Sequence, residues 1–171
     1  MSPANSTGIP VEGSELAELE RFVFTEAKLA DESRYDEWEA LTAEDMIYWV
    51  PRGGGDFQPD SDVSLINDNR ARLATRIRQL KTGTRHSQTP VSSMRRLVSN
   101  LVATRTDSGE YEVESNFALF EMQLQSLEQV TIWAGRTVHR LRRTDAGLRM
   151  YFKKVMLING DQPVPTLAFL I

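Results

Sequence analysis

The chain has 171 residues, 40% of them hydrophobic and 26% charged, and its formal net charge is −4. This length suffices for one soluble domain with a substantial core. The acidic balance argues against a general nucleic-acid binder, because such affinity comes from neutralising many phosphates. The chain contains no cysteine, which excludes disulfides and thiolate sites.

The N-terminal residues set the expected boundaries of the domain. No window approaches the ~18 continuous apolar residues of a membrane span, and the first residues lack the basic and apolar regions of a secretory signal. We therefore expect a cytoplasmic protein with no membrane partner. Residues 1–13 mix Pro, Gly, Ser and Asn without periodicity, which predicts a flexible arm, and residues 14–171 are predicted to form a single domain.

Three helices are predicted in the N-terminal half. The first covers residues 14–30, where apolar residues recur at helical spacing behind Ser14, a suitable N-cap. A short second helix begins at Ser33. The third is capped by Asp68 or Asn69 and carries a narrow apolar stripe.

Six strands are predicted by apolar runs and by alternation of apolar and polar residues. Five of them cover residues 46–50, 95–105, 111–124, 130–142 and 148–158, and a short apolar piece at 63–66 leads into the third helix. The first is apolar throughout, so both of its faces should be covered. Turns at 107–109 and 145–147 end in glycine and favour antiparallel hairpins. Helices followed by a meander predict an α+β fold, with three helices on a curved antiparallel sheet of about six strands.

The search for catalytic motifs finds little. His86 and His139 are too far apart in sequence for a local metal-binding pattern, and the alternation around His139 leaves its facing ambiguous. The glycines at 53–55 do not precede a helix, so a phosphate-binding loop is not expected. Acidic residues over 36–45 are interpreted as a solvated helix face and a turn.

Two further features allow more than one interpretation. The basic helix over 70–85 could bind an anion, or its long cationic side chains could border an interface or shield the core. The aromatic residues Tyr35, Trp38, Tyr48 and Trp49 could line a pocket or pack inside the domain. Local spacing does not decide between these alternatives.

The ordered segments YWVP, SLINDNRARL, LVSN and a strand containing WAGR resemble the β (small) subunit family of bacterial aromatic-ring-hydroxylating dioxygenases. The resemblance runs from about Leu16 to Ile171. It includes DEWEALTAED, which many cone-shaped nuclear-transport-factor-like domains share. The chain departs from the family pattern at Arg96, where His is common, and at Leu148, where Trp is frequent. The implied fold is a cone-shaped, cystatin-like or nuclear-transport-factor-like domain.

This resemblance implies a structural small subunit without catalytic residues or a cofactor. A catalytic α subunit would carry a Rieske [2Fe-2S] cluster and a mononuclear non-heme iron, and three α and three β subunits would form a hexamer. A chain without cysteine cannot itself bind a Rieske cluster. The complex would oxidise an aromatic compound with O2 and electrons from NAD(P)H, delivered by a reductase with or without a ferredoxin. Candidate core or subunit-interface anchors are Trp38, Tyr48, Trp49, Arg70, Arg76, Trp133 and Arg136.

Two other functions compete with this interpretation. Cone-shaped domains include stand-alone dehydratases, isomerases and cyclases that act in an apolar pocket, and a fold alone does not decide function. The candidate residues for such a pocket are Tyr48, Asp45, His86 and His139. An anion or nucleic-acid module built on the basic helix would bind with a steep dependence on salt.

Overall fold

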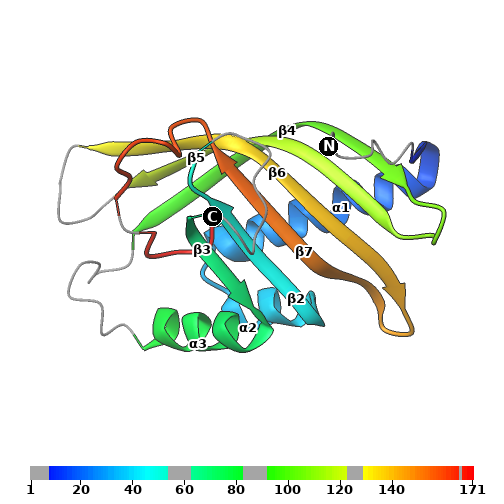
Figure 1. Cartoon of the computed structure of the whole chain (residues 1–171), viewed down its shortest axis with the longest axis horizontal. Helices are drawn as coiled ribbons and strands as arrows, with labels where there is room; N and C mark the ends of the chain where they lie inside the picture. The colour runs from blue at the N-terminus through cyan, green and yellow to red at the C-terminus, as the bar shows by residue number, and fades with distance from the viewer. Residues whose placement is uncertain (1–7, 54–62, 83–91, 123–128, 166) are drawn as a thin grey trace.

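The computed structural model describes residues 8–53, 63–82, 92–122, 129–165 and 167–171. Its seven strands are β1 (Ile9–Pro10), β2 (Thr42–Pro51), β3 (Ser64–Asn69), β4 (Ser93–Arg105), β5 (Tyr111–Met122), β6 (Val130–Thr144) and β7 (Gly147–Leu157). They form one open, curved sheet in the order β1-β4-β5-β6-β7-β2-β3 (Figure 1). The α+β prediction is confirmed, with one strand more than the six expected.

Three helices accompany the sheet, as predicted: α1 (Gly13–Asp31), α2 (Tyr35–Ala40) and α3 (Arg70–Lys81). In α3 the Asn69 side chain accepts a hydrogen bond from the Arg72 amide at 3.0 Å, which identifies Asn69 as the N-cap. The predicted cap of α1 is wrong, because Glu12 occupies the N-cap position and Ser14 lies inside the helix. In Figure 1, α1 crosses one face of the long strands, while α2 and α3 lie beside β2 and β3.

The hairpins β4–β5, β5–β6 and β6–β7 are antiparallel, as predicted. Gly109 and Gly147 adopt φ values of 82° and 94° in the two predicted turns, a region that glycine enters without steric cost. The sheet is nevertheless mixed, because β2 pairs with β7 in parallel. The prediction of a purely antiparallel sheet is therefore wrong. A hydrophobic pattern indicates which face of a strand is buried but not which strand lies beside it.

The predicted N-terminal arm also needs correction. Ile9 and Pro10 pair with Arg105 and Thr104 of β4, so these two residues of the predicted arm belong to the sheet, and α1 begins three positions later at Gly13. Residues 1–7 of that predicted arm lie outside the described residues. Strand β1 is the one that sequence periodicity missed, since two residues are too few to show alternation.

Strand β5 illustrates how the sheet divides its two faces. Its side chains alternate between buried and partly or fully exposed positions along the whole strand, as expected for a sheet with one face against the core. Strand β2 was predicted to be covered on both faces, and Met46, Tyr48, Trp49 and Val50 are buried. Ile47 remains 37% exposed, so the cover is incomplete.

The close approach of β6 and β7 depends on Gly135. A Cβ placed on Gly135 would lie 2.0 Å from the Met156 carbonyl oxygen, far inside van der Waals contact. The WAGR segment therefore combines an inward tryptophan, Trp133, with a residue that must lack a side chain.

Candidate functional site

A buried carboxylate accepts hydrogen bonds from a cluster of polar side chains in the interior of the domain. Glu26, on α1, is 2% exposed. Its Oε1 accepts hydrogen bonds from Trp38 Nε1 at 2.6 Å and from Lys153 Nζ at 2.7 Å. Lys153 is itself 1% exposed and comes from the inward row of β7. The pair therefore joins α1 to the sheet, and Trp38 adds α2 to the same acceptor.

The charges in this cluster compensate one another. Burial alone would raise the pKa of the Glu26 carboxyl, but Lys153, His139 and Arg96 together hold that pKa well below its usual range. Burial lowers the pKa of the Lys153 ammonium, and Glu26 opposes that shift. Glu26 is therefore the anionic partner of Lys153 at neutral pH. A buried ion pair of this kind fixes geometry, while its net contribution to stability is small.

His139 lies beside Glu26 and is fully enclosed, which settles its facing. Its Nε2 is 3.6 Å from Glu26 Oε2, too long for a hydrogen bond. Among the described residues neither ring nitrogen has a hydrogen-bond partner. Burial lowers the pKa of the His139 imidazole although Glu26 acts in the opposite direction, so His139 is neutral in the folded chain at neutral pH.

The predicted aromatic anchors are core residues. Trp38 and Tyr48 are fully buried and meet edge to face, with ring centroids 6.3 Å apart. Trp49 donates from Nε1 to the Ser64 hydroxyl at 2.9 Å. Trp133 is 4% exposed and donates from Nε1 to Glu121 at 2.9 Å. Each buried indole nitrogen among these residues thus has an acceptor.

The predicted arginine anchors differ in how strongly they are paired within the chain. Arg70 and Arg76 form ion pairs with Glu39 and Asp68, respectively, so part of the basic helix is neutralised within the chain. Arg136 has a side chain that is 59% exposed and lies 3.8 Å from Glu114. Whether any of these residues contacts another subunit stays a prediction.

Of the three described residues of the pocket-enzyme hypothesis, Asp45 does not join the other two. Tyr48 and His139 are enclosed in the core. Asp45 is on the surface, where Arg142 donates to its carboxylate and lowers its pKa. His86 lies outside the described residues.

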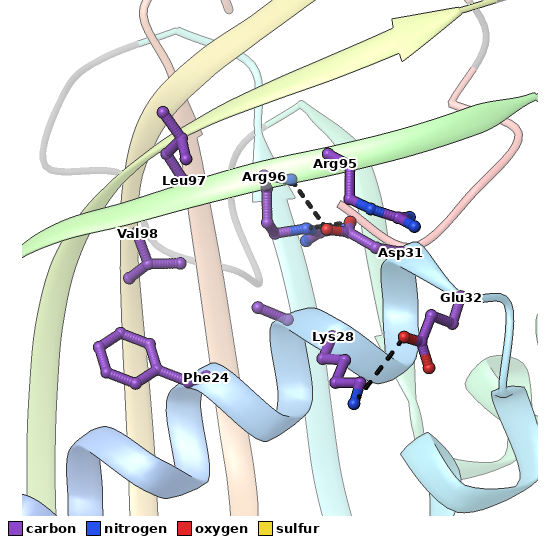
Figure 2. Close-up of a pocket in the computed structure, with 9 residues that line it drawn as sticks. Phe24, Lys28, Asp31, Glu32, Arg95, Arg96, Leu97 and Val98 are labelled. Atoms are coloured by element: carbon purple, nitrogen blue, oxygen red, sulfur yellow. Dashed lines mark hydrogen bonds and ion pairs between the residues drawn. The ribbon is translucent and has the colours of Figure 1, made fainter.

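A surface groove between α1 and β4 encloses about 330 Å³ (Figure 2). Four of its five charged side chains are paired with each other, and the fifth, Arg95, donates to the Met94 carbonyl oxygen at 2.7 Å. Arg96 donates from its amide and from Nε to Asp31 at 2.8 and 2.7 Å, and Lys28 lies 4.0 Å from Glu32. Figure 2 shows Phe24 and Val98 facing each other across the groove. The groove thus combines apolar side chains with charged groups that have partners, and among the described residues it holds no free pair of acid and base.

The face of the sheet opposite to α1 exposes large apolar side chains to solvent. Across β4, β5 and β6, Phe120 pairs in register with Arg95 and Ile132, and Met122 pairs with Val130. Exposed fractions are 66% for Leu97, 39% for Phe120, 49% for Met122, 48% for Val130 and 61% for Ile132. We call these five residues the outer face. Apolar side chains exposed side by side, as Phe120 with Ile132 and Met122 with Val130, mark interaction sites on soluble proteins.

Sequence reasoning missed Glu26 and Lys153. A signal was present in both cases: Glu26 falls on the same helical face as Val23 and Ala30, and Lys153 alternates with the buried Val155. A charge at a core position predicts a buried partner. Within the described residues no group of three or more histidine, aspartate or glutamate side chains could hold a metal ion, and no helix is long and apolar enough to cross a membrane.

Comparison with known proteins gives consistent matches. The model of the family described as ring hydroxylating beta subunit matches residues 25–161. Benzene 1,2-dioxygenase subunit beta of Pseudomonas putida is 32% identical over 163 residues, which cover 89% of this chain and 86% of that protein.

Solved structures extend the match to the fold. The beta subunit of the benzoate 1,2-dioxygenase from Burkholderia mallei aligns with a TM-score of 0.73 at 21% identity, covering 90% of this chain and 97% of that one. An NTF2-like protein with a cystatin-like fold from Novosphingobium aromaticivorans aligns with a TM-score of 0.56 at 16% identity, covering 86% and 84%. The cystatin-like fold is confirmed. The family model and the sequence relative together show that this chain belongs to the family of ring-hydroxylating dioxygenase beta subunits.

Proposed function

We propose that this small dioxygenase subunit has a structural role: it packs its outer face against partner subunits and holds the catalytic subunits in a productive arrangement. The outer face is the observation that carries the proposal. Its exposed side chains, among them Leu97 and Ile132, would be costly to leave in water at about 25 cal/mol per Å² of apolar surface. A permanent interface of roughly 2,000–5,000 Å² would remove them from solvent.

The interior supports a structural role as well. Glu26, Lys153 and Trp38 satisfy one another, and Tyr48 is hydrogen bonded to the main chain of Ile171. Groups with these fixed partners are poorly placed to exchange a proton with a substrate. We therefore place the chemistry in the partner, the catalytic α subunit, which would carry the Rieske cluster and the mononuclear non-heme iron.

The proposed complex is a cytoplasmic hexamer of three α and three β subunits. Its substrate class is an aromatic compound, oxidised with O2 and electrons that originate from NAD(P)H and arrive through a reductase, with or without a ferredoxin. A ring of three copies uses two different surfaces on each copy. The outer face is one surface spread over β4, β5 and β6, and we assign it to the contact with the α subunit.

The test is a charge placed on the outer face. Ile132→Glu, at a position 61% exposed, should leave the stability of the isolated chain nearly unchanged, since surface substitutions usually stay within about 0.5 kcal/mol. It should sharply reduce the amount of α subunit that co-purifies with this chain, because a buried unpaired charge is costly. Val63→Glu, at a site 70% exposed and away from the outer face, is the matched control. Equal co-purification by both variants would refute the assignment.

A further inference from the structure

The final residues of the described chain lie inside the cone. Ala168, Phe169, Leu170 and Ile171 are 8%, 2%, 0% and 1% exposed, although residues 167–171 form neither helix nor strand. We call residues 167–171 the closing segment. Figure 1 shows the C-terminal residue at the centre of the molecule, against the sheet. An irregular segment can be buried only if its main-chain polar groups find partners.

Two side chains from the sheet provide partners for three of these main-chain groups. The Tyr48 hydroxyl accepts a hydrogen bond from the Ile171 amide at 3.0 Å and donates one to the main-chain oxygen of Ile171, also at 3.0 Å. Arg96 donates from Nη2 to the Leu170 carbonyl oxygen at 2.9 Å. These contacts recognise the main chain of an extended peptide and are independent of its side chains.

The two recognising groups are held by contacts outside the closing segment. Arg96 and Asp31 form an ion pair at 2.7 Å with side chains that are 4% and 7% exposed. Tyr48 packs against Trp38 and belongs to β2, which lies between β3 and β7.

One contact also involves a side chain of the closing segment, and that side chain is aromatic. The Phe169 ring meets the Trp133 ring edge to face, with centroids 5.6 Å apart and planes at 75°. Trp133 is fixed by its hydrogen bond to Glu121. The recognising residues therefore come from β2, β4 and β6, three strands whose pairing does not involve the closing segment.

We propose that the interior of the cone is a binding site for an extended apolar peptide, read through its main chain by Tyr48 and Arg96 and through one aromatic side chain by Trp133. The closing segment occupies this site as a ligand attached to the same chain. The site exists on the sheet before the segment enters. A free peptide of the same sequence can therefore replace the segment once it is removed.

The direct experiment removes residues 166–171 and adds a synthetic peptide, Leu-Ala-Phe-Leu-Ile. The shortened chain should retain the circular dichroism of the folded sheet and bind the peptide, with a change in tryptophan fluorescence from Trp133. The peptide Leu-Ala-Ala-Leu-Ile should bind about 100-fold more weakly, because truncating a buried phenylalanine is costly. Tyr48→Phe in the shortened chain should weaken binding about tenfold. A folded shortened chain that binds neither peptide would overturn the proposal.

If the shortened chain does not fold, hydrogen exchange on the full chain tests whether the closing segment behaves as a bound ligand or as ordinary core. The amides of Leu170 and Ile171 should exchange through a local opening that is faster than the opening at Leu119, a buried residue of β5. Tyr48→Phe should accelerate exchange at Ile171 about tenfold without a comparable change at Leu119. Exchange at Ile171 as slow as at Leu119, with both accelerated equally by Tyr48→Phe, would show that the segment is ordinary core.

Discussion

Replacing Lys153 with methionine tests the buried ion pair directly. The substitution keeps a long unbranched side chain of similar volume and removes the only positive charge within hydrogen-bond distance of Glu26 among the described residues. Both side chains are at most 3% exposed, so water cannot take the place of the ammonium. Lys153→Met should therefore leave a buried, uncompensated carboxylate.

The expected loss follows from that burial. Removing one partner of a buried pair typically costs about 3–5 kcal/mol, much more than the pair contributes overall. For a chain of this length, 1 kcal/mol corresponds to a shift of about 2–4 °C in melting temperature. Lys153→Met should thus lower the melting temperature by about 6–20 °C at neutral pH. The double variant Glu26→Gln with Lys153→Met should recover much of this loss, because a neutral amide can still accept from Trp38.

The pH dependence of the single variant has a defined sign. In the native chain the pKa of Glu26 is lowered, so its contribution to stability is present above the unfolded value of 4.5 and is lost as pH falls below it. Without Lys153, burial raises the pKa of Glu26 above its unfolded value. The variant then recovers stability relative to the native chain as pH falls and Glu26 takes up a proton.

Urea unfolding at pH 7 and at pH 5, followed by tryptophan fluorescence, measures both effects. Lys28→Met is the matched control, since its side chain is 65% exposed and its contact with Glu32 is 4.0 Å, and it should cost less than about 1 kcal/mol. A loss below about 1 kcal/mol for Lys153→Met, or a penalty that grows toward pH 5, would refute the reasoning.

Two further outcomes follow from the interior and the sheet. The pKa of His139 is lowered by burial, so the stability that this neutral imidazole contributes is present above its unfolded pKa of 6.5 and is lost as pH falls below it. The free energy of unfolding should therefore decline less between pH 7 and pH 5.5 in His139→Gln than in the native chain. An identical decline in both chains would contradict this expectation. Gly135→Ala should destabilise the chain by about 1–3 kcal/mol, because its Cβ would meet the Met156 carbonyl oxygen at 2.0 Å. Ala134→Gly, the reverse substitution at the neighbouring, partly buried position, is the control. An unfolding midpoint for Gly135→Ala equal to that of the native chain would show that β6 and β7 can separate at this point.

Local patterns predicted most of the secondary structure because one face of the long strands is buried and the other is open. Strand β5 alternates along its length, and its neighbours β4 and β6 were placed within a few residues of their observed ends. The parallel pairing of β2 with β7 could not be predicted in this way. It joins segments about 100 residues apart, and the local sequence of neither strand indicates which strand it pairs with.

The polar interior was less accessible to sequence reasoning. Glu26 has the appearance of a solvated helical residue until its position between buried residues of α1 is considered together with Lys153 of β7. The two residues are 127 positions apart. The apolar character of residues 167–171 was evident, but only the structure places Tyr48 and Arg96 against their main chain. Trp133 was predicted as a core or subunit-interface anchor, and it is buried, whereas the side chain of Arg136 is 59% exposed.

The proposed structural role is tested most directly by producing the large iron-containing subunit with and without this chain. The native mass of the large subunit and its turnover of an aromatic substrate would be measured in both preparations. Our account predicts that the large subunit alone loses its assembled mass and most of its turnover, and that this chain restores both in equal stoichiometry. A large subunit that keeps its assembled mass and its full turnover alone would contradict it.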